Sequence, residues 1–307
     1  MNERWGLLLL LALLGAGWGI TQPLAKIAVS EGYRHFGIIF WQLAIGTVIL
    51  GGITLARGRG LPLSPRHLGL YAVIALTGTL IPNAASFQAA VHLPAGILSI
   101  LLSLVPIFAF PVALALGTDR FGWLRLGGLA CGLAGVALIV GPETSLPDPA
   151  LAVFIPLALV APFFYALEGN IVGKWGVLGL DPFQVLFGAS ALGLVVALPL
   201  ALSTGHFIDP RGTWGAPETA IVLSSLVHAG VYTGYVWMVG RAGAVFAAQV
   251  SYLVTGFGVL WAMAILGERF SASVWLAMLV MFAGLFLVQP RPSLPIAEPG
   301  LRGKDAV

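Results

Sequence analysis

The sequence predicts an all-α integral membrane protein with ten transmembrane helices in two inverted five-helix repeats. Three observations support this fold class: the composition, the spacing of the apolar segments and an internal repeat. Of the 307 residues, 59% are hydrophobic and 9% are charged, whereas soluble domains carry about 25% charged residues. Such a chain has too little polar surface to cover a water-facing globule, so we expect it to lie in a lipid bilayer.

Ten apolar segments are long enough to cross a bilayer, which takes about 20 residues each. Turn signals rich in Gly, Pro and Asp separate them, and the alternating pattern of membrane strands is absent. The first segment has too long an apolar run for a signal peptide, so we expect it to be retained. The expected helices span 5–29, 35–55, 67–90, 94–116, 121–140, 150–173, 181–202, 216–239, 244–266 and 271–289.

The Lys and Arg residues are distributed unequally between the two sides of these helices. With the N-terminus inside, eleven of them lie in inner segments and four in outer ones. The positive-inside rule then places both termini in the cytoplasm. We expect a multi-pass protein of the plasma or inner membrane with a disordered cytoplasmic tail at 291–307. The basic residues are scattered, so we expect no nucleic-acid partner.

An internal repeat divides the chain into two halves. Segment 115–142 resembles segment 264–290: each has an apolar helix, an acidic-Arg-Phe turn, a second apolar helix and a proline. The two turns lie 149 positions apart. We therefore expect one five-helix repeat over 1–142 and another over 143–290. Because five is odd, the second repeat enters the membrane from the opposite side, as in transporters with a site near the bilayer midplane.

Polar residues recur along single faces of several expected helices. Those of the eighth segment follow i, i+4, i+7 spacing, and the 149-residue offset places another polar face in the third segment. A second pair of stripes runs along the ninth and fourth segments. Polar groups facing lipid are costly, so these faces should turn toward protein or a water-filled cavity. The substrate-binding candidates among them are Thr79, Asn83, Ser99, Ser103, His228, Tyr232, Tyr235, Gln249, Tyr252 and Thr255.

The first segment also carries polar residues on one face. Trp18, Gln22 and Lys26 recur every four residues. In the repeat alignment they lie opposite Phe164 or Tyr165, Glu168 or Gly169, and Gly173 of the sixth segment. Prolines interrupt both segments, and paired interrupted helices are typical of a transport site. We expect Trp18, Gln22 and Tyr165 to bind substrate. Glu168 is a possible coupling residue, because a carboxylate within the membrane can carry a proton.

Each candidate also has a structural alternative. The tyrosines can pack between helices with their hydroxyl groups bonded to a neighbour, and the serines and Thr255 can link helices by hydrogen bonds. Glu168 can pair with a basic group, and Lys26 can extend to the membrane surface. The fifth and tenth segments are nearly devoid of polar residues and look peripheral. Gly128 and Gly132 there suit close helix contact, which allows a homodimer through helices 5 and 10.

Several short motifs recur in a fixed order. They are "WG" followed by a proline and a lysine in the first segment, a proline at position 106, and "LGTDRF" and "LGERF" before the last segment of each half. In these features the chain resembles the drug/metabolite transporter superfamily, in its EamA-type branch of ten-helix permeases. The resemblance covers about residues 5–290. It extends to amino-acid exporters of the YddG type, whose aromatic-rich cavity face is similar.

The resemblance implies export or exchange of small metabolites, often amino acids. It also implies a central cavity lined chiefly by helices 1, 3, 4, 6, 8 and 9. Many relatives have an arginine in the second helix where Gln42 stands here. This difference argues against a fixed cation in the cavity for a carboxylate or a phosphate.

The sequence therefore favours a secondary transporter that exports or exchanges small metabolites, in particular aromatic or other neutral amino acids, by alternating access. No GxxxxGK[ST] motif supports ATP-driven transport. The alternatives are an intramembrane lipid-modifying enzyme or, among transporters, a nucleotide-sugar or drug carrier. The five histidines are dispersed and no HExxH or DxxD motif occurs, so we expect no catalytic residue, no metal and no cofactor. The expected partners are the lipid bilayer and a small-molecule solute.

Overall fold

The structure is a computed structural model that describes residues 3–142, 146–242 and 249–288. All regular elements in these ranges are helices. They are α1 Glu3–Ser30, α2 His35–Ala56, α3 Pro65–Ala75, η1 Leu76–Leu80, α4 Ile81–His92, α5 Ala95–Leu102, α6 Val105–Ala115, α7 Trp123–Val140, η2 Pro149–Phe154, α8 Ile155–Trp175, α9 Pro182–Ser203, α10 Ala216–Ala242, α12 Val250–Leu266 and α13 Ala272–Leu287.

Among the described residues, seven helical runs are long and apolar enough to cross a membrane, and α12 and α13 are shorter apolar helices. This all-α architecture fits the predicted integral membrane protein. The expected segment 67–90 is one run made of α3, η1 and α4, and the expected segment 94–116 is made of α5 and α6. The expected helix 244–266 begins outside the described residues, and the tail at 291–307 lies outside them entirely.

Two of these runs are interrupted in ways that change the direction of their side chains. The π-helical turn η1 separates α3 from α4, and π-helical turns often occur at functional sites. The break between α5 and α6 falls at Ser103 and Leu104, directly before Pro106 in the first turn of α6. Proline has no backbone N–H to donate, so it suits the beginning of a helix.

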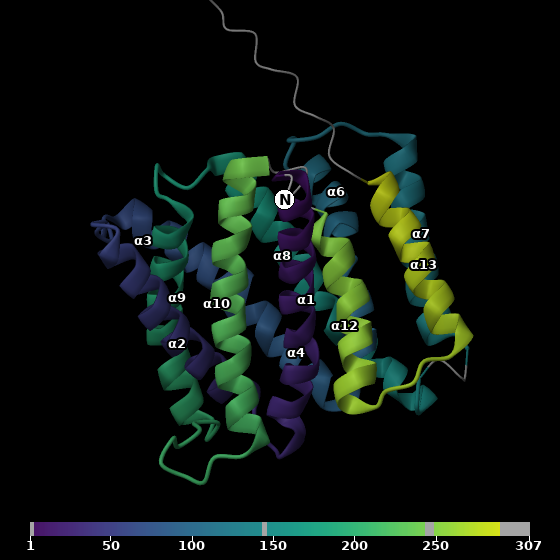
Figure 1. Ribbon diagram of the computed structural model, residues 1–307. Helices are drawn as coiled ribbons and strands as arrows, with labels where there is room; N and C mark the ends of the chain where they lie inside the picture. The colour runs from purple at the N-terminus through teal and green to yellow at the C-terminus, as the bar shows by residue number, and fades with distance from the viewer. Residues whose placement is uncertain (1–2, 143–145, 243–248, 289–307) are drawn as a thin grey trace, which may run out of the picture.

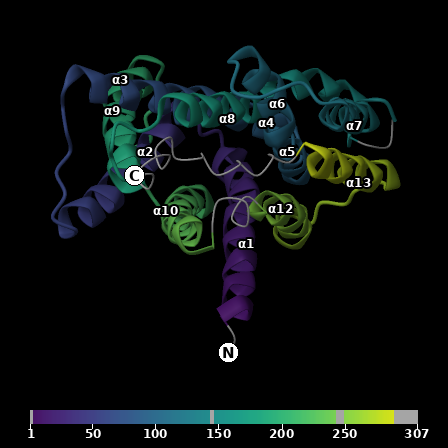
Figure 2. The same ribbon diagram turned by 90° about the horizontal axis from the view of Figure 1, so that it is seen from above.

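The helices form an elongated bundle of two groups, which pack against each other at both ends of the bundle. Viewed from above (Figure 2), α1 runs between α10 and α12, while α8 lies on the other side with α4 and α6. α2, α3 and α9 pack together at one end of the bundle, and α7 packs on α13 at the other (Figure 1). The site described below lies between α1 and α8.

The α7–α13 contact depends on glycines, as the sequence indicated for Gly128. A Cβ atom at Gly128 would lie 2.7 Å from the carbonyl oxygen of Gly284 on α13. At Gly132 a Cβ atom would instead meet Ile107 of α6 at 2.9 Å. Small residues let helix backbones approach closely in a membrane. These two helices are peripheral, as predicted.

Opposite charges from the two halves hold the turn between α4 and α5. The Lys26 ammonium donates to the carbonyl oxygens of Ala90, Val91 and Leu93 at 2.7, 3.2 and 3.0 Å. The Glu268 carboxylate accepts from the backbone N–H groups of Ala95 and Gly96, at 2.7 and 3.0 Å. A cation at the end of one helix and an anion at the start of the next match the helix dipoles. Lys26 therefore caps the C-terminal end of α4.

Candidate functional site

A cavity of about 230 Å³ lies in the middle of the bundle; we call it the central cavity. Helices from both halves of the chain contribute to it: α1, α2, the η1–α4 run, α8, α9 and α10. Its walls are formed by Thr21, Gln22, Ala25, Gln42, Leu43, Gly46, Leu50, Gly78, Thr79, Asn83, Ser86, Phe87, Tyr165, Leu186, Ser190, Ser224, Ser225, His228, Ala229 and Tyr232.

Helical spacing brings the polar wall residues to one face of each helix. On α10, His228 and Tyr232 are four residues apart and both face the cavity. On the η1–α4 run, Thr79, Asn83 and Ser86 do the same from the opposite half of the chain. The two faces that correspond in the repeat alignment thus meet across one cavity.

A chain of hydrogen bonds links three helices at the cavity wall. The Tyr165 hydroxyl of α8 donates to Asn83 Oδ1 at 2.9 Å. The Asn83 amide nitrogen donates to Gln42 Oε1 of α2 at 3.4 Å. Asn83 therefore has its side-chain oxygen and nitrogen engaged, and its orientation is fixed between α2 and α8.

Gln22 differs from these residues because its amide oxygen has no partner. Among the described residues, Gln22 Oε1 is buried and accepts no hydrogen bond, although the side chain lines the cavity. Burying an acceptor without a partner costs about 1–3 kcal/mol. A solute with an N–H or O–H donor would recover this loss on binding.

Trp18 and Tyr235 lie behind His228 rather than on the cavity wall. The Trp18 indole N–H donates to His228 Nδ1 at 3.3 Å, and the Trp18 ring contacts the Tyr235 ring at 5.3 Å between centroids. Because His228 Nδ1 accepts, a neutral His228 carries its proton on Nε2. Trp18 therefore holds the His228 ring, and Tyr235 packs on Trp18.

The wall of the central cavity is neutral over the described residues. It contains amides, hydroxyl groups, phenols and one imidazole, and no Asp, Glu, Lys or Arg side chain. The Glu168 carboxylate of α8 lies against Gly78 of η1, which lines the cavity. A Cβ atom at Gly78 would lie 2.5 Å from Glu168 Oε1.

The structure thus brings six of the predicted substrate-binding residues to the cavity wall and two more directly behind it. The six are Gln22, Thr79, Asn83, Tyr165, His228 and Tyr232, and the two are Trp18 and Tyr235.

The other predicted residues lie away from the central cavity. Ser99 and Thr255 are buried where α5 packs on α12, and each donates to a carbonyl oxygen of its own helix, at 3.0 and 3.2 Å. Ser103 does the same at 2.7 Å. The Tyr252 ring contacts Phe282 of α13 at 5.8 Å between centroids. Gln249 precedes α12 and is exposed.

Six polar wall residues were not predicted to bind substrate: Thr21, Gln42, Ser86, Ser190, Ser224 and Ser225. The sequence held a signal for several of them. Ser190 lies 148 positions after Gln42, so the repeat relates the two. Ser224 continues the face of His228 and Tyr232 by one helical turn, and Ser225 is its neighbour. The resemblance implied that the fourth and ninth of the ten expected segments, 94–116 and 244–266, line the cavity. The described cavity is lined instead by α2 and α9, which correspond to the second and seventh segments.

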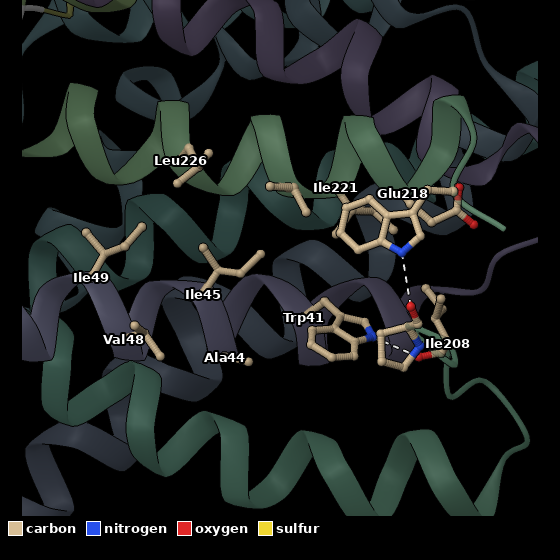
Figure 3. A pocket seen from close by; sticks show the side chains of 12 residues that line it. Trp41, Ala44, Ile45, Val48, Ile49, Ile208, Glu218, Ile221 and Leu226 are labelled. Atoms are coloured by element: carbon tan, nitrogen blue, oxygen red, sulfur yellow. Dashed lines mark hydrogen bonds between the residues drawn. The ribbon is translucent and has the colours of Figure 1, made fainter. Parts of the chain in front are cut away.

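A larger groove lies on the outer side of α2 and α10 (Figure 3). It has a volume of about 460 Å³ and an almost entirely apolar wall, including Ile45, Val48 and Leu226. The indole N–H groups of Trp41 and Trp214 at one end donate to carbonyl oxygens of the 204–215 turn, both at 3.0 Å. Because its wall is almost entirely apolar, this groove suits lipid chains.

Comparisons with known proteins identify the fold and the family. The profile of the EamA-like transporter family matches residues 4–141 and again residues 153–289. A probable terminal-alkyne amino-acid exporter of Streptantibioticus cattleyicolor is 23% identical over 266 residues, which cover 84% of each chain. A solved structure, described only as the crystal structure of a protein, has a TM-score of 0.61 at 17% identity. That match covers 91% of this chain and 96% of the other, and it shows the fold alone.

Proposed function

The chain belongs to the EamA-like transporter family, and from this premise we propose that it is a secondary transporter for small neutral amino acids. One observation carries the proposal: helices of both halves enclose a cavity with a neutral, hydrogen-bonding wall and one unpaired acceptor. A zwitterionic solute fits such a wall, because its net charge is zero and its ammonium group can donate to Gln22 Oε1. The amino-acid export named for the Streptantibioticus relative agrees with this solute class.

We further propose ten spans in two inverted repeats, 1–142 and 143–290, which move the solute by alternating access. The helix contacts support this arrangement. α1 packs on α10 and α12, and α8, its counterpart in the second half, packs on α4 and α6. α2 pairs with its counterpart α9, and α7 pairs with α13. Exchanging the halves therefore preserves the contacts, as an inverted repeat requires. Both termini are placed in the cytoplasm, in a plasma or inner membrane.

The proposed substrate-binding residues are the six on the cavity wall, supported by Trp18 and Tyr235. Ser99, Ser103, Gln249, Tyr252 and Thr255 stay predictions, and Ser99 and Thr255 would meet the solute only if α5 and α12 separated. The homodimer through α7 and α13 also stays a prediction. The outer faces of these helices carry exposed apolar residues such as Leu133 and Leu279, which contact either lipid or a second copy.

Glu168 is proposed as the coupling residue. Its carboxylate lies beside the cavity behind Gly78, and it forms no salt bridge among the described residues. Among the described residues, the phenols of Tyr165 and Tyr232 interact electrostatically with Glu168. We expect Glu168→Gln to lose the response of transport to an imposed pH gradient, while the exposed control Glu31→Gln keeps it. An unchanged gradient response in Glu168→Gln would exclude this role.

Counterflow in vesicles reconstituted with the purified protein tests the proposed function. Vesicles are loaded with one unlabelled neutral amino acid at a time, and the uptake of radiolabelled L-phenylalanine is measured. We expect exchange with aromatic and other neutral amino acids. No exchange with any amino acid by a folded protein would refute the proposal. Exchange with drugs or nucleotide sugars alone would favour those carriers, and a chemically altered lipid would favour the enzyme.

A further inference from the structure

A second cavity lies at the end of the bundle where α1 ends and α2 begins; we call it the vestibule. Its volume is about 410 Å³. The turn between α1 and α2 forms one side, and α4, η2 and the start of α8 form the other. The residues used below are Arg34, Phe87, Gln88, His92 and Phe154, all of which line it.

The side chain of Phe87 separates the vestibule from the central cavity. It is the residue that lines both cavities, and only 5% of it is exposed. A solute that moves from the central cavity toward this end of the bundle therefore meets the Phe87 ring first and the vestibule next.

The walls of the vestibule differ from those of the central cavity in charge. The Arg34 guanidinium is exposed and forms no salt bridge among the described residues. The nearby carboxylate of Glu218 is engaged by the Tyr33 hydroxyl and by the Gly215 backbone N–H. Across the vestibule, the His92 ring stacks on Phe154 with 3.7 Å between centroids and 6° between planes. One side thus offers a cation, and the other a flat aromatic surface.

We propose that the vestibule is a second solute subsite, specific for carboxylates with an apolar or aromatic side chain. Arg34 binds the carboxylate, for which a guanidinium offers two parallel N–H donors, and the His92–Phe154 stack contacts the side chain. This inference rests on the proposed function and adds to it. The neutral central cavity receives the whole zwitterion, and the vestibule recognises its carboxylate.

Thiol reactivity in the vestibule tests this subsite without a transport measurement. Cys131 is the only cysteine, so Cys131→Ala gives a cysteine-free protein. Gln88→Cys then places one thiol in the vestibule, since Gln88 is exposed and bonds only the Ala84 carbonyl of its own helix. Ala272→Cys is the matched control, because Ala272 is exposed at the start of α13 and lies outside the vestibule.

Two reagents of opposite charge are compared, sulfonatoethyl and trimethylammonioethyl methanethiosulfonate, and the comparison between the two positions cancels their different intrinsic reactivities. For each position we take the ratio of the modification rate by the anionic reagent to that by the cationic reagent. We expect this ratio to be about fivefold higher at position 88 than at position 272, because one nearby cation would produce a difference of this size. Arg34→Gln should abolish this preference, and Arg34→Lys should keep much of it. L-phenylalanine should slow modification at position 88 and not at position 272. Phenethylamine, which lacks the carboxylate, should protect neither position.

Equal reagent preferences at positions 88 and 272, or a preference that survives Arg34→Gln, would overturn the subsite. Equal protection by L-phenylalanine and phenethylamine would overturn it as well. Counterflow measured on the same preparation separates this failure from failure of the proposed function. L-phenylalanine exchange without protection at position 88 removes the vestibule subsite alone, whereas protection without exchange supports the subsite and removes the transporter.

Discussion

Two pairs of polar stripes, similar in the sequence, have different surroundings in the structure. The stripe on α10 and its counterpart on the η1–α4 run face the central cavity. The stripe on α12 and its counterpart on α5 are pressed together, with Ser99 and Thr255 at 1% exposure or less. Both arrangements keep polar groups away from lipid, as the cost of exposing them there requires.

Side-chain length explains the difference. Ser99 and Thr255 are short, so their hydroxyl groups bond carbonyl oxygens of their own helix and leave α12 free to approach α5. Asn83 and Tyr165 are long, so they hydrogen-bond across helices and hold them apart. In these two pairs of stripes, Ser99 beside Gly258 belongs to a helix contact, whereas Asn83 and Tyr165 belong to a cavity wall.

The α5–α12 contact should be the more sensitive of the two regions to added volume. A Cβ atom at Gly258 would lie 2.7 Å from Ser99 Cβ, whereas nothing lies within 4 Å of a Cβ atom at Gly256 on the same helix. We expect Gly258→Val to lower the free energy of unfolding by about 3 kcal/mol and Gly256→Val to change it far less. Unfolding in detergent measures both. Equal losses would show that α5 and α12 are not tightly packed.

The cavity wall should be the more sensitive region to loss of a polar group in transport. Asn83→Leu removes the link between Tyr165 and Gln42, and we expect counterflow to fall about tenfold or more, the effect of losing about 1.4 kcal/mol. Asn170→Leu is the matched control. Asn170 also bonds carbonyl oxygens within the bundle, those of Ala109 and Ala166, but does not line the cavity. Equal transport by both variants would contradict the assignment of the wall.

Removing a hydroxyl group from the α5–α12 contact should have a small effect. Ser99→Ala deletes one hydrogen bond to the carbonyl oxygen of Ala95 and fills less volume against Gly258. We expect a loss of about 0.6 kcal/mol in unfolding free energy and unchanged counterflow. A tenfold loss of transport in a stable Ser99→Ala protein would instead indicate that this stripe lies on the substrate path.

The smallest predicted effect is a pH dependence of the stability, which comes from Tyr33 in the turn that joins α1 to α2. The hydrogen bond from the Tyr33 hydroxyl to Glu218, together with burial and nearby negative charge, raises the pKa of Tyr33 to about 12. In the unfolded chain this pKa is about 10. The protonated phenol therefore contributes stability below pH about 10, and this contribution is lost as the pH rises toward about 12. Unfolding measured over this range should show the loss in the wild type and not in Tyr33→Phe; identical pH profiles would contradict it.

Much of the fold followed from hydropathy and turn signals, because the bilayer requires long apolar helices. The expected segment 35–55 differs from α2 by one residue at one end, and 181–202 differs from α9 by one residue at each end. The η1 turn was not foreseen, since hydropathy does not register a π-helical turn. Gly78 and Thr79 of this turn line the central cavity.

The candidate site was predictable where the repeat and the helical period agreed, as for Asn83 and His228. The packing of Ser99 and Thr255 between α5 and α12 was not predictable, because periodicity identifies a polar face without showing what that face meets. Gln42 was noticed only as a departure from relatives, yet its amide oxygen completes the hydrogen-bond chain from Tyr165. Partners across helices depend on tertiary packing, which a single sequence does not record.

The central claim is that the central cavity binds the solute, and Gln22→Met tests it most directly. The substitution keeps the length of the side chain and removes the buried acceptor that has no partner among the described residues. We predict L-phenylalanine counterflow about tenfold lower than in the wild type, with an unfolding free energy that is equal or higher because an unsatisfied group is gone. Unchanged counterflow in a folded Gln22→Met protein would contradict the account.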